Sequence, residues 1–378
     1  MAAAERAALS AAQVLALSEA GVLPRSILLP FHEVRELSWD EASGTGRIEA
    51  VRRNRFDDWF YACHFLGDPV MPGCWGLDAV WQALKVFAHW RGLPGAFKPL
   101  GMEGVSFFGQ IRPYDREIVY AVEVTSLERD GGDSLLTAKA TVSVDATPVY
   151  TIDSAQVGTC FWDGDGAAAP ELPPAPARDL RARLNWSEFS GRADFTAPEI
   201  VALARGALVQ DPPHELPLLP DSLMLEVTDV RRLRVDADGG EGEVLATRRN
   251  GRDEWFYPMN AGVKPAALLV DGVWQLMGVY HARLGSAGMG RALGFERVEF
   301  FGEASPGDGE IVYRLRVLKT VRALGGDVFV RADAEVFAGG RKLLACANAN
   351  VGCHRGIRYE DYPLASEMGR GGKLKVKG

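Results

Sequence analysis

The chain has 378 residues, which is long enough for two or three domains of roughly 100–200 residues each. Hydrophobic residues make up 47% and charged residues 24%, values that exclude wholesale disorder, a collagen-like fibre and a multi-span membrane protein. Lys and Arg total 42 against 50 Asp and Glu, and a net charge of −8 without a long basic run disfavours nucleic acid and anionic membranes as partners.

The first half predicts, in chain order, a short helix, a loop, a long helix and several strands. A short amphipathic helix is expected near residues 11–19. The loop after Trp59-Phe60-Tyr61 leads to a long helix that begins at Pro72-Gly73. This helix is apolar on nearly all faces, so other structure must surround it. Residues 117–124 then alternate between apolar and polar, which predicts a strand.

The second half follows the same plan. We expect a helix over residues 197–205, capped by Thr196, and a strand over residues 222–230. A second long apolar helix comes next, and residues 310–317 show the alternation of a strand. One long helix followed by antiparallel strands in each half is an α+β pattern, with a curved sheet folded around the helix.

Short sequences that recur at fixed offsets show that the halves are copies of one unit. Trp59-Phe60-Tyr61 recurs as Trp255-Phe256-Tyr257, at an offset of 196. Asp78-x-Val80-Trp81-Gln82 recurs as Asp271-x-Val273-Trp274-Gln275, at an offset of 193. The second copy has therefore lost 196 − 193 = 3 residues between these two motifs. We predict one domain over residues 1–163, a Pro/Ala-rich linker over 164–184, a second domain over 185–360 and a flexible basic tail over 361–378.

The loop of the first copy carries the most specific motif. It reads Cys63-His64-Phe65-Leu66-Gly67-Asp68-Pro69-Val70-Met71-Pro72-Gly73-Cys74-Trp75-Gly76-Leu77-Asp78. This segment resembles the active-site segment of the bacterial 3-hydroxydecanoyl-acyl-carrier-protein dehydratase/isomerases. The similarity covers most of residues 10–160, and the second copy resembles the same family over roughly residues 195–353 with a degenerate loop. Two copies in one chain are also similar to the dehydratase regions of polyunsaturated fatty acid synthases.

The resemblance implies a double hot-dog fold, in which each copy is a curved antiparallel sheet wrapped around its central helix. It also implies dehydration of a 3-hydroxyacyl thioester to a 2-enoyl thioester. The family's catalytic histidine and carboxylate match His64 and Asp78, and in the second copy Asp271. The chemistry agrees, because removal of a C2 proton needs a base such as histidine and departure of the hydroxyl needs a carboxyl group. The helix that begins at Gly73 offers free N–H groups to the thioester oxygen.

The second copy lacks the base. Asn260 stands where the first copy has His64, and an amide cannot act as a base at neutral pH. Asp271 remains, while Ala266 matches Gly73. In the family, each site lies between two paired hot dogs, so the resemblance implies one working site of His64 with Asp271 and a degenerate one of Asn260 with Asp78. Gln82, four residues beyond Asp78, is placed to hydrogen-bond it. The spacing of Asp271 and Gln275 resembles the acidic motif of polyketide-synthase dehydratases.

We expect no metal and no redox cofactor, because the chemistry is proton transfer alone and the five cysteines show no metal-ligand spacing. The acyl chain is expected on the phosphopantetheine of an acyl carrier protein, with no nucleic acid or membrane partner. The two copies would form the pair within one chain, and a further homodimer is open. We expect a cytoplasmic protein. Three alternatives remain open: a trans-2/cis-3 enoyl isomerase, a hot-dog thioesterase and a non-catalytic acyl-binding scaffold.

Overall fold

A computed structural model describes residues 5–164, 166–178, 183–236 and 241–355. Within this part of the chain, both copies contribute to one sheet of 13 strands in the order β1-β2-β3-β5-β6-β7-β4-β10-β13-β12-β11-β9-β8. The elements of the first half are β1 (Glu5–Leu9), α1 (Ala11–Glu19), η1 (Ser26–Leu28), β2 (Glu33–Asp40), β3 (Thr45–Arg53), η2 (Trp59–Ala62), α2 (Gly73–Trp90), β4 (Lys98–Phe107), β5 (Glu117–Asp130), β6 (Asp133–Val144) and β7 (Thr147–Gly158).

The second half repeats this order after two short helices. Its elements are α3 (Trp186–Gly191), α4 (Ala197–Ala204), η3 (Ser222–Met224), β8 (Asp229–Arg234), β9 (Gly242–Arg248), η4 (Tyr257–Met259), α5 (Ala266–Arg283), β10 (Met289–Phe300), β11 (Ile311–Arg322), β12 (Val328–Ala338) and β13 (Arg341–His354). Thr196 caps α4 by accepting a hydrogen bond from the Glu199 N–H, as the sequence predicts. The double hot-dog fold is confirmed.

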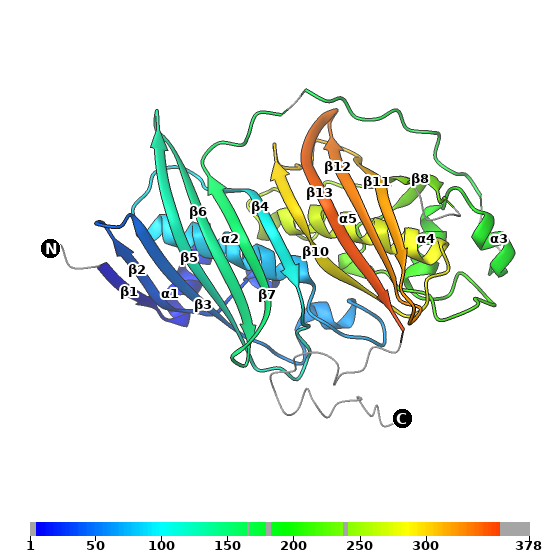
Figure 1. The fold of residues 1–378 in the computed structure, drawn as a ribbon. Helices are drawn as coiled ribbons and strands as arrows, with labels where there is room; N and C mark the ends of the chain where they lie inside the picture. Colours follow the sequence, from blue (N-terminus) through cyan, green and yellow to red (C-terminus); the bar gives the residue numbers. More distant parts are fainter. Residues whose placement is uncertain (1–4, 165, 179–182, 237–240, 356–378) are drawn as a thin grey trace.

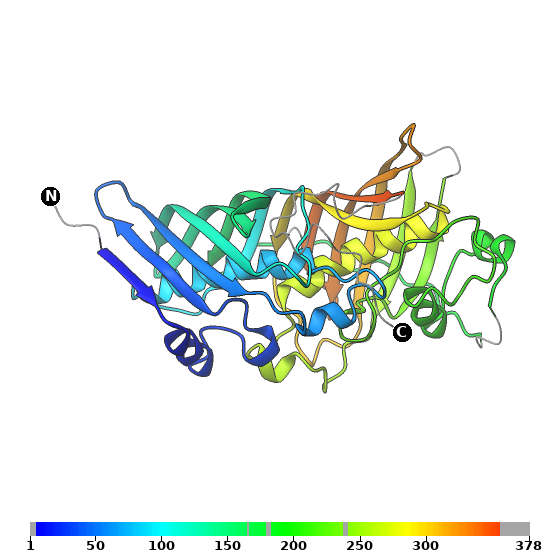
Figure 2. The same cartoon turned by 90° about the horizontal axis from the view of Figure 1, so that it is seen from below.

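The two long helices lie against the same face of the sheet and pack on each other (Figures 1 and 2). Helix α2 contacts β3 to β7, and α5 contacts β9 and β11 to β13. Nearly every residue of both helices is buried, which explains why the sequence shows apolar side chains on all their faces. The helices therefore form the centre of the core.

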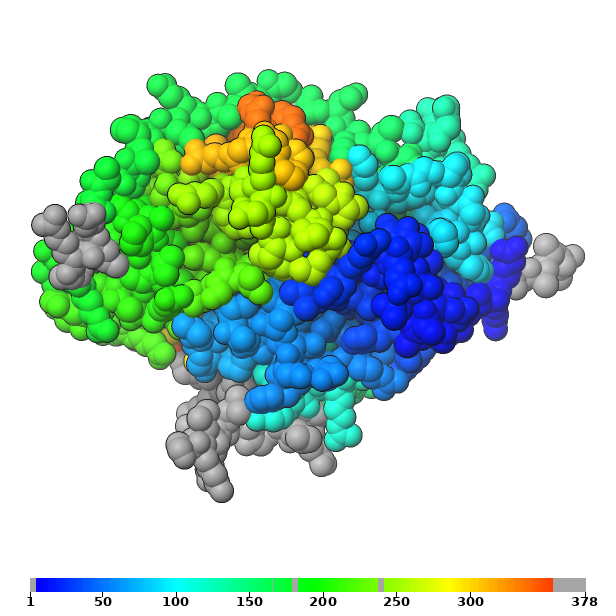
Figure 3. Space-filling view, turned by 180° about the vertical axis from the view of Figure 1, so that it is seen from behind, coloured from blue at the N-terminus to red at the C-terminus, as the bar shows by residue number. Residues whose placement is uncertain are grey.

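Strands β4 and β10 join the two copies into one sheet. They pair antiparallel, with Met102 opposite Val298 near the middle of the ladder. Since these strands are equivalent in the two copies, the pairing is close to a two-fold arrangement. The same relation appears on the other side of the molecule, where the blue N-terminal segment lies against the yellow-green part of the second half (Figure 3). There the Arg25 N–H donates to the Met259 carbonyl (2.8 Å), and the equivalent Asp221 N–H donates to the Cys63 carbonyl (2.9 Å).

The sequence-based prediction of a strand over residues 222–230 is wrong. The chain instead forms η3 and an irregular segment, and β8 begins only at Asp229. Two backbone groups of the segment bind a side chain rather than a neighbouring strand: the Met224 carbonyl accepts from Gln275 Nε2, and the Glu226 N–H donates to Gln275 Oε1. A tertiary contact therefore overrides the local β pattern.

The described part of the linker, residues 166–178, runs along the outside of the molecule (Figure 1). Ala169 and Leu172 pack against a small cluster on the second half, formed by Leu245, Val312 and Phe337. The predicted tail, residues 361–378, lies outside the described residues. Among the helices that the structure describes, none combines the length and apolarity needed to cross a membrane.

Candidate active site

Two cavities lie where the copies meet, and each takes residues from both. The first contains about 890 Å³ of space, part of it open to solvent, and both His64 and Asp271 line it. The second contains about 1370 Å³, and both Asp78 and Asn260 line it. The structure thus brings together His64 with Asp271 and Asn260 with Asp78. The other candidate residues divide the same way: Gly73 and Gln275 line the first cavity, and Gln82 and Ala266 the second.

His64 is held in a single orientation by the loop that follows η2. The Val70 N–H donates to the His64 carbonyl (2.9 Å), and the ring atom Nδ1 lies 2.9 Å from the Val70 carbonyl oxygen. Because a carbonyl oxygen can only accept, Nδ1 carries the proton and Nε2 keeps its lone pair. Burial lowers the pKa of His64 to about 4, with a further contribution from the positive charge of Arg291. The imidazole is therefore a neutral base with Nε2 available.

Asp271 lies within α5 and is buried. Its Oδ2 accepts a hydrogen bond from Gln275 Nε2 (2.6 Å), one helical turn further along, and its carboxyl group is also hydrogen-bonded to the Cys74 thiol of α2. Burial raises the pKa of Asp271 to about 7, and the nearby Glu226 charge acts in the same direction. The side chain therefore retains a proton in mildly acidic solution, where an exposed aspartate would be ionised.

The rest of the first cavity is mostly apolar. Gly73, the first residue of α2, lines it, and the backbone N–H groups of a first helical turn have no partner within the helix. A Cβ at Gly73 would lie only 3.0 Å from the Phe107 ring, so a side chain here would crowd the cavity wall. Apolar side chains from both copies surround the remaining space: Val70, Met71, Phe107, Ile111, Leu218, Leu219, Trp274 and Val351.

A buried ion pair joins the His64 loop to the other copy. Arg291 of β10 contacts Asp68 of the loop, with 2.5 Å between Nη2 and Oδ2. Its Nε donates to Gln110 Oε1 (2.9 Å), and its guanidinium lies 6.0 Å from the Phe65 ring centroid. Both charged side chains are about nine-tenths buried, which makes the pair less screened by solvent than a surface ion pair. The second copy therefore helps to hold the loop that carries His64.

The second cavity keeps the carboxylate but not the base. Asn260 Nδ2 donates to the Val263 carbonyl (3.1 Å), so the amide repeats the contact that His64 makes with its own loop. Burial raises the pKa of Asp78 to about 6, and Gln82 Nε2 donates to Asp78 Oδ1 (3.2 Å). The lining is also more polar, since Lys85 and Glu303 face this space where the first cavity has Gly278 and Gln110. This site has an acid without a partner base.

Sequence reasoning missed several residues of the site. Arg291 and Glu226 lie outside the repeated motifs, and Lys264, although it lies in the loop between Asn260 and Ala266, belongs to no recognisable pattern. A position-by-position comparison of the two copies would have found two of them, because Glu226 and Lys264 are buried charges where the first copy has Pro30 and Met71. Among the described residues, no group of three or more His, Cys, Asp and Glu side chains is placed to hold a metal ion.

Comparison with known proteins agrees with the two-copy architecture. The model of the FabA-like domain matches residues 23–153 and again residues 218–346, which together make up most of the chain.

Solved structures with similar folds share little sequence with this chain. A protein described as a thioesterase from Novosphingobium aromaticivorans DSM 12444 is 15% identical, with a TM-score of 0.47 over 82% of this chain and 96% of that one. The dehydratase domain from the CurJ module of Curacin polyketide synthase is 12% identical, with a TM-score of 0.47 over 87% and 97%. The dehydratase domain of RzxB from Pseudomonas fluorescens is 11% identical, with a TM-score of 0.46 over 86% and 99%. On the family match and its own fold, the chain belongs to the FabA-like domain family, with two copies of the domain in tandem.

Proposed function

We propose that the protein dehydrates 3-hydroxyacyl thioesters to 2-enoyl thioesters at one active site, formed by His64 and Asp271. One observation supports this most directly. The first cavity brings together a histidine whose pKa is lowered and an aspartate whose pKa is raised. A neutral base and a protonated acid therefore exist at the same pH, which is the combination that elimination of water requires.

In the proposed reaction, His64 Nε2 removes a proton from C2 of the substrate. The electron pair of that C–H bond forms the C2–C3 double bond while the C3–O bond breaks. The leaving hydroxyl takes the proton of the Asp271 carboxyl group and departs as water. The N–H group of Gly73, in the first turn of α2, stabilises the charge that develops on the thioester oxygen. Proton exchange with solvent then restores neutral His64 and protonated Asp271.

The surroundings of the cavity support a thioester with a long apolar acyl chain. Apolar side chains form most of the wall, and burial of a CH₂ group stabilises binding by about 0.8 kcal/mol. We propose that an acyl carrier protein delivers the substrate on its phosphopantetheine arm, in the cytoplasm, during synthesis of fatty acids or related polyketides. Proton transfer by the two side chains would need neither a metal ion nor a redox cofactor.

An assay with the full chain and 3-hydroxydecanoyl-pantetheine, in buffer with excess EDTA, tests the proposal. Formation of the conjugated enoyl thioester, followed by its ultraviolet absorbance, is the expected result. Release of free pantetheine thiol without enoyl product would instead identify a thioesterase. Conversion of added trans-2-decenoyl thioester to the cis-3 product would show the isomerase reaction. Absence of any conversion would contradict an enzymatic role.

The pH dependence of kcat/KM should reflect the two shifted groups. His64 is neutral above pH of about 4, and Asp271 is protonated below pH of about 7. We therefore expect the highest activity between these values and a tenfold decrease per pH unit above pH 7, as Asp271 loses its proton. Initial rates at low substrate concentration between pH 4 and 9 measure the profile. An activity that keeps rising above pH 8 would contradict the role of Asp271 as the acid.

A further inference from the structure

The two copies hold their helix glutamines differently. In the second copy, Gln275 is fixed on three sides: Nε2 donates to Asp271 Oδ2 (2.6 Å) and to the Met224 carbonyl (2.7 Å), and Oε1 accepts from the Glu226 N–H (2.8 Å). In the first copy, Gln82 Nε2 reaches Asp78 Oδ1 at 3.2 Å, and its buried Oε1 has no hydrogen-bond partner among the described residues. The glutamine is therefore locked only beside Asp271.

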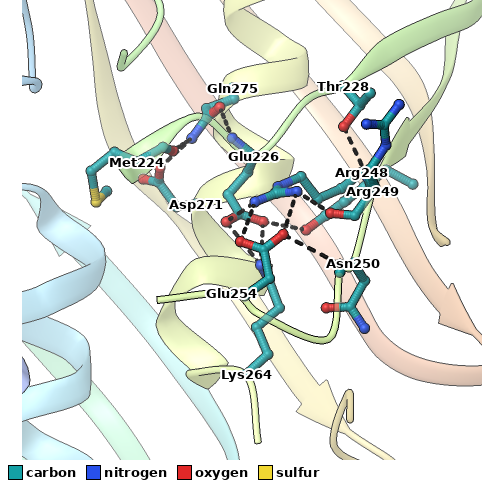
Figure 4. Close-up of polar contacts among 12 residues, drawn as sticks. Met224, Glu226, Thr228, Arg248, Arg249, Asn250, Glu254, Lys264, Asp271 and Gln275 are labelled. Atoms are coloured by element: carbon teal, nitrogen blue, oxygen red, sulfur yellow. Dashed lines mark hydrogen bonds and ion pairs between the residues drawn. The ribbon is translucent and has the colours of Figure 1, made fainter. Parts of the chain in front are cut away.

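A buried network around Glu226 accounts for the difference (Figure 4). Lys264 Nζ lies 2.9 and 2.8 Å from the two carboxylate oxygens of Glu226, and both side chains are almost fully buried. The Tyr313 hydroxyl donates to Glu226 Oε2 (3.3 Å), and Arg248 Nε lies 4.0 Å from Oε1. Arg248 is itself paired with Glu254 at 2.9 Å. Glu226 is thus anchored by its side chain, while its backbone N–H holds Gln275.

The first copy keeps the outer ion pair of this network, since Arg52 pairs with Asp58 at 2.8 Å, but it lacks the groups around Glu226. Pro30 stands where the second copy has Glu226, and proline has no N–H to offer Gln82. Met71 replaces Lys264. Tyr120, the counterpart of Tyr313, has a buried hydroxyl without a hydrogen-bond partner among the described residues. The charged pair, the N–H donor and the tyrosine hydrogen bond therefore occur together, and only beside the aspartate that shares a cavity with His64.

We infer that Glu226 and Lys264 are positioning residues of the proposed dehydratase site: their ion pair fixes the Met224–Glu226 backbone, which orients Gln275 and through it the Asp271 carboxyl group. The inference rests on the proposed function. It goes beyond that function because neither residue lines the first cavity, and Lys264 lines the second, so both reach the His64 site through Gln275 and Asp271.

The same network sets the charge around Asp271. The described groups that face it are Cys63 and Cys74 from the first copy, Gln275 from its own helix, Glu226 from the segment before β8, Tyr313 from β11 and His64 across the cavity. Glu226 is the negative charge among them that raises the pKa of Asp271, and Lys264 compensates that charge. Loss of Lys264 leaves Arg248 and Tyr313 to stabilise the Glu226 carboxylate. Loss of the Glu226 charge has the opposite effect on Asp271.

Two substitutions test the ion pair through the pH profile. Lys264→Met installs the residue of the first copy, and Glu226→Gln removes the charge but keeps the backbone N–H. We expect each to decrease kcat by about 10- to 100-fold with little change in KM, since a small displacement of a catalytic group has effects of this size. The upper pH limit of activity should move to higher pH in Lys264→Met and to lower pH in Glu226→Gln. If the ion pair only stabilised the fold, both variants would give less folded protein and the upper pH limit would not move in opposite directions.

If an unpaired buried charge prevents these variants from folding, two conservative substitutions still test the inference. Tyr313→Phe removes one hydrogen bond to Glu226, whereas Tyr120→Phe removes the hydroxyl that has no partner. Tyr313→Phe should decrease kcat severalfold and shift the pH limit, and Tyr120→Phe should leave both unchanged. Equal effects of the two substitutions would contradict the inference. The double variant Glu226→Gln with Lys264→Met buries no unpaired charge and should fold. Its upper pH limit should lie closer to that of the wild type than the limits of the two single variants do.

A crystal structure of Lys264→Met separates this inference from the proposed function. We expect the Gln275 amide to be rotated or disordered and the 2.6 Å contact with Asp271 to be lengthened. This result is independent of any turnover. Unchanged positions of Gln275 and Asp271 would overturn the positioning role even if the enzyme is a dehydratase. If the wild-type chain has no dehydratase activity while Gln275 does move, the proposed function fails and the structural coupling stands.

Discussion

His64→Ala should decrease kcat for 3-hydroxyacyl thioester dehydration by about 10⁴-fold, the upper end of the effect of a general base. In the first cavity His64 is the side chain that offers a neutral ring nitrogen, because its Nδ1 is occupied by the Val70 carbonyl. The substitution removes that nitrogen and leaves the apolar wall intact. Steady-state kinetics at pH 6 measure the loss, and circular dichroism shows whether the variant is folded.

Asn260→Ala is the matched control for the base. Asn260 occupies the equivalent position in the second copy and makes the equivalent contact with its loop carbonyl. Because it lines the cavity that lacks a base, its removal should leave kcat nearly unchanged. A large loss in Asn260→Ala, or residual dehydration in His64→Ala at near wild-type rate, would show that catalysis occurs elsewhere.

The two aspartates should be strongly unequal. Asp271→Asn removes the proton that assists departure of water, and we expect a loss of about 10²–10⁴-fold in kcat. Asp78→Asn should cost far less, because Asp78 lines the cavity with Asn260 and can affect the first cavity only through packing. Both substitutions keep the size of the side chain. If Asp78→Asn shows the larger loss, each copy works with its own aspartate and the shared site is wrong.

A substrate analogue separates the role of the acid from that of the base. In a 3-chloroacyl thioester, chloride leaves C3 without needing a proton. Asp271→Asn should therefore regain much of its activity on this analogue, while His64→Ala should remain inactive because the C2 proton must still be removed. Failure of the analogue to rescue Asp271→Asn would indicate that Asp271 maintains the site rather than donating a proton.

Much of the architecture follows from the sequence because the two copies can be compared with each other. The repeated motifs place equivalent helices in both halves: the first long helix begins at Gly73, as the sequence predicts, and the second begins at the matching residue, Ala266. The predicted strand over 117–124 lies within β5, and the one over 310–317 matches β11 from Ile311 onward. The pairing of His64 with Asp271 came from the family resemblance, and the structure places the two side chains in one cavity.

What the sequence did not reveal depends on contacts between distant residues. Lys264 and Glu226 are 38 positions apart, and Arg291 is 223 positions from Asp68. A charged residue is usually exposed, so a sequence pattern reads each of these side chains as surface. The wrong prediction of a strand over 222–230 also results from a contact between distant residues. Gln275 from α5 hydrogen-bonds to backbone groups that would otherwise pair with a neighbouring strand. A periodic pattern in one copy does not show that a charged residue is buried. Comparison of the two copies would show it, because the charge is present in one copy and absent from the other.

The β4–β10 ladder has a consequence for how the two copies could diverge. In a dimer of separate chains, each subunit must supply both the base and the acid, and dilution favours dissociation by mass action. Here the ladder joins two segments of one polypeptide, so their effective concentration is fixed by the linker and not by the amount of protein. Each copy therefore meets the other copy within its own chain. One could then specialise in carrying the base and the other in holding the acid, without any loss of site formation at low protein concentration.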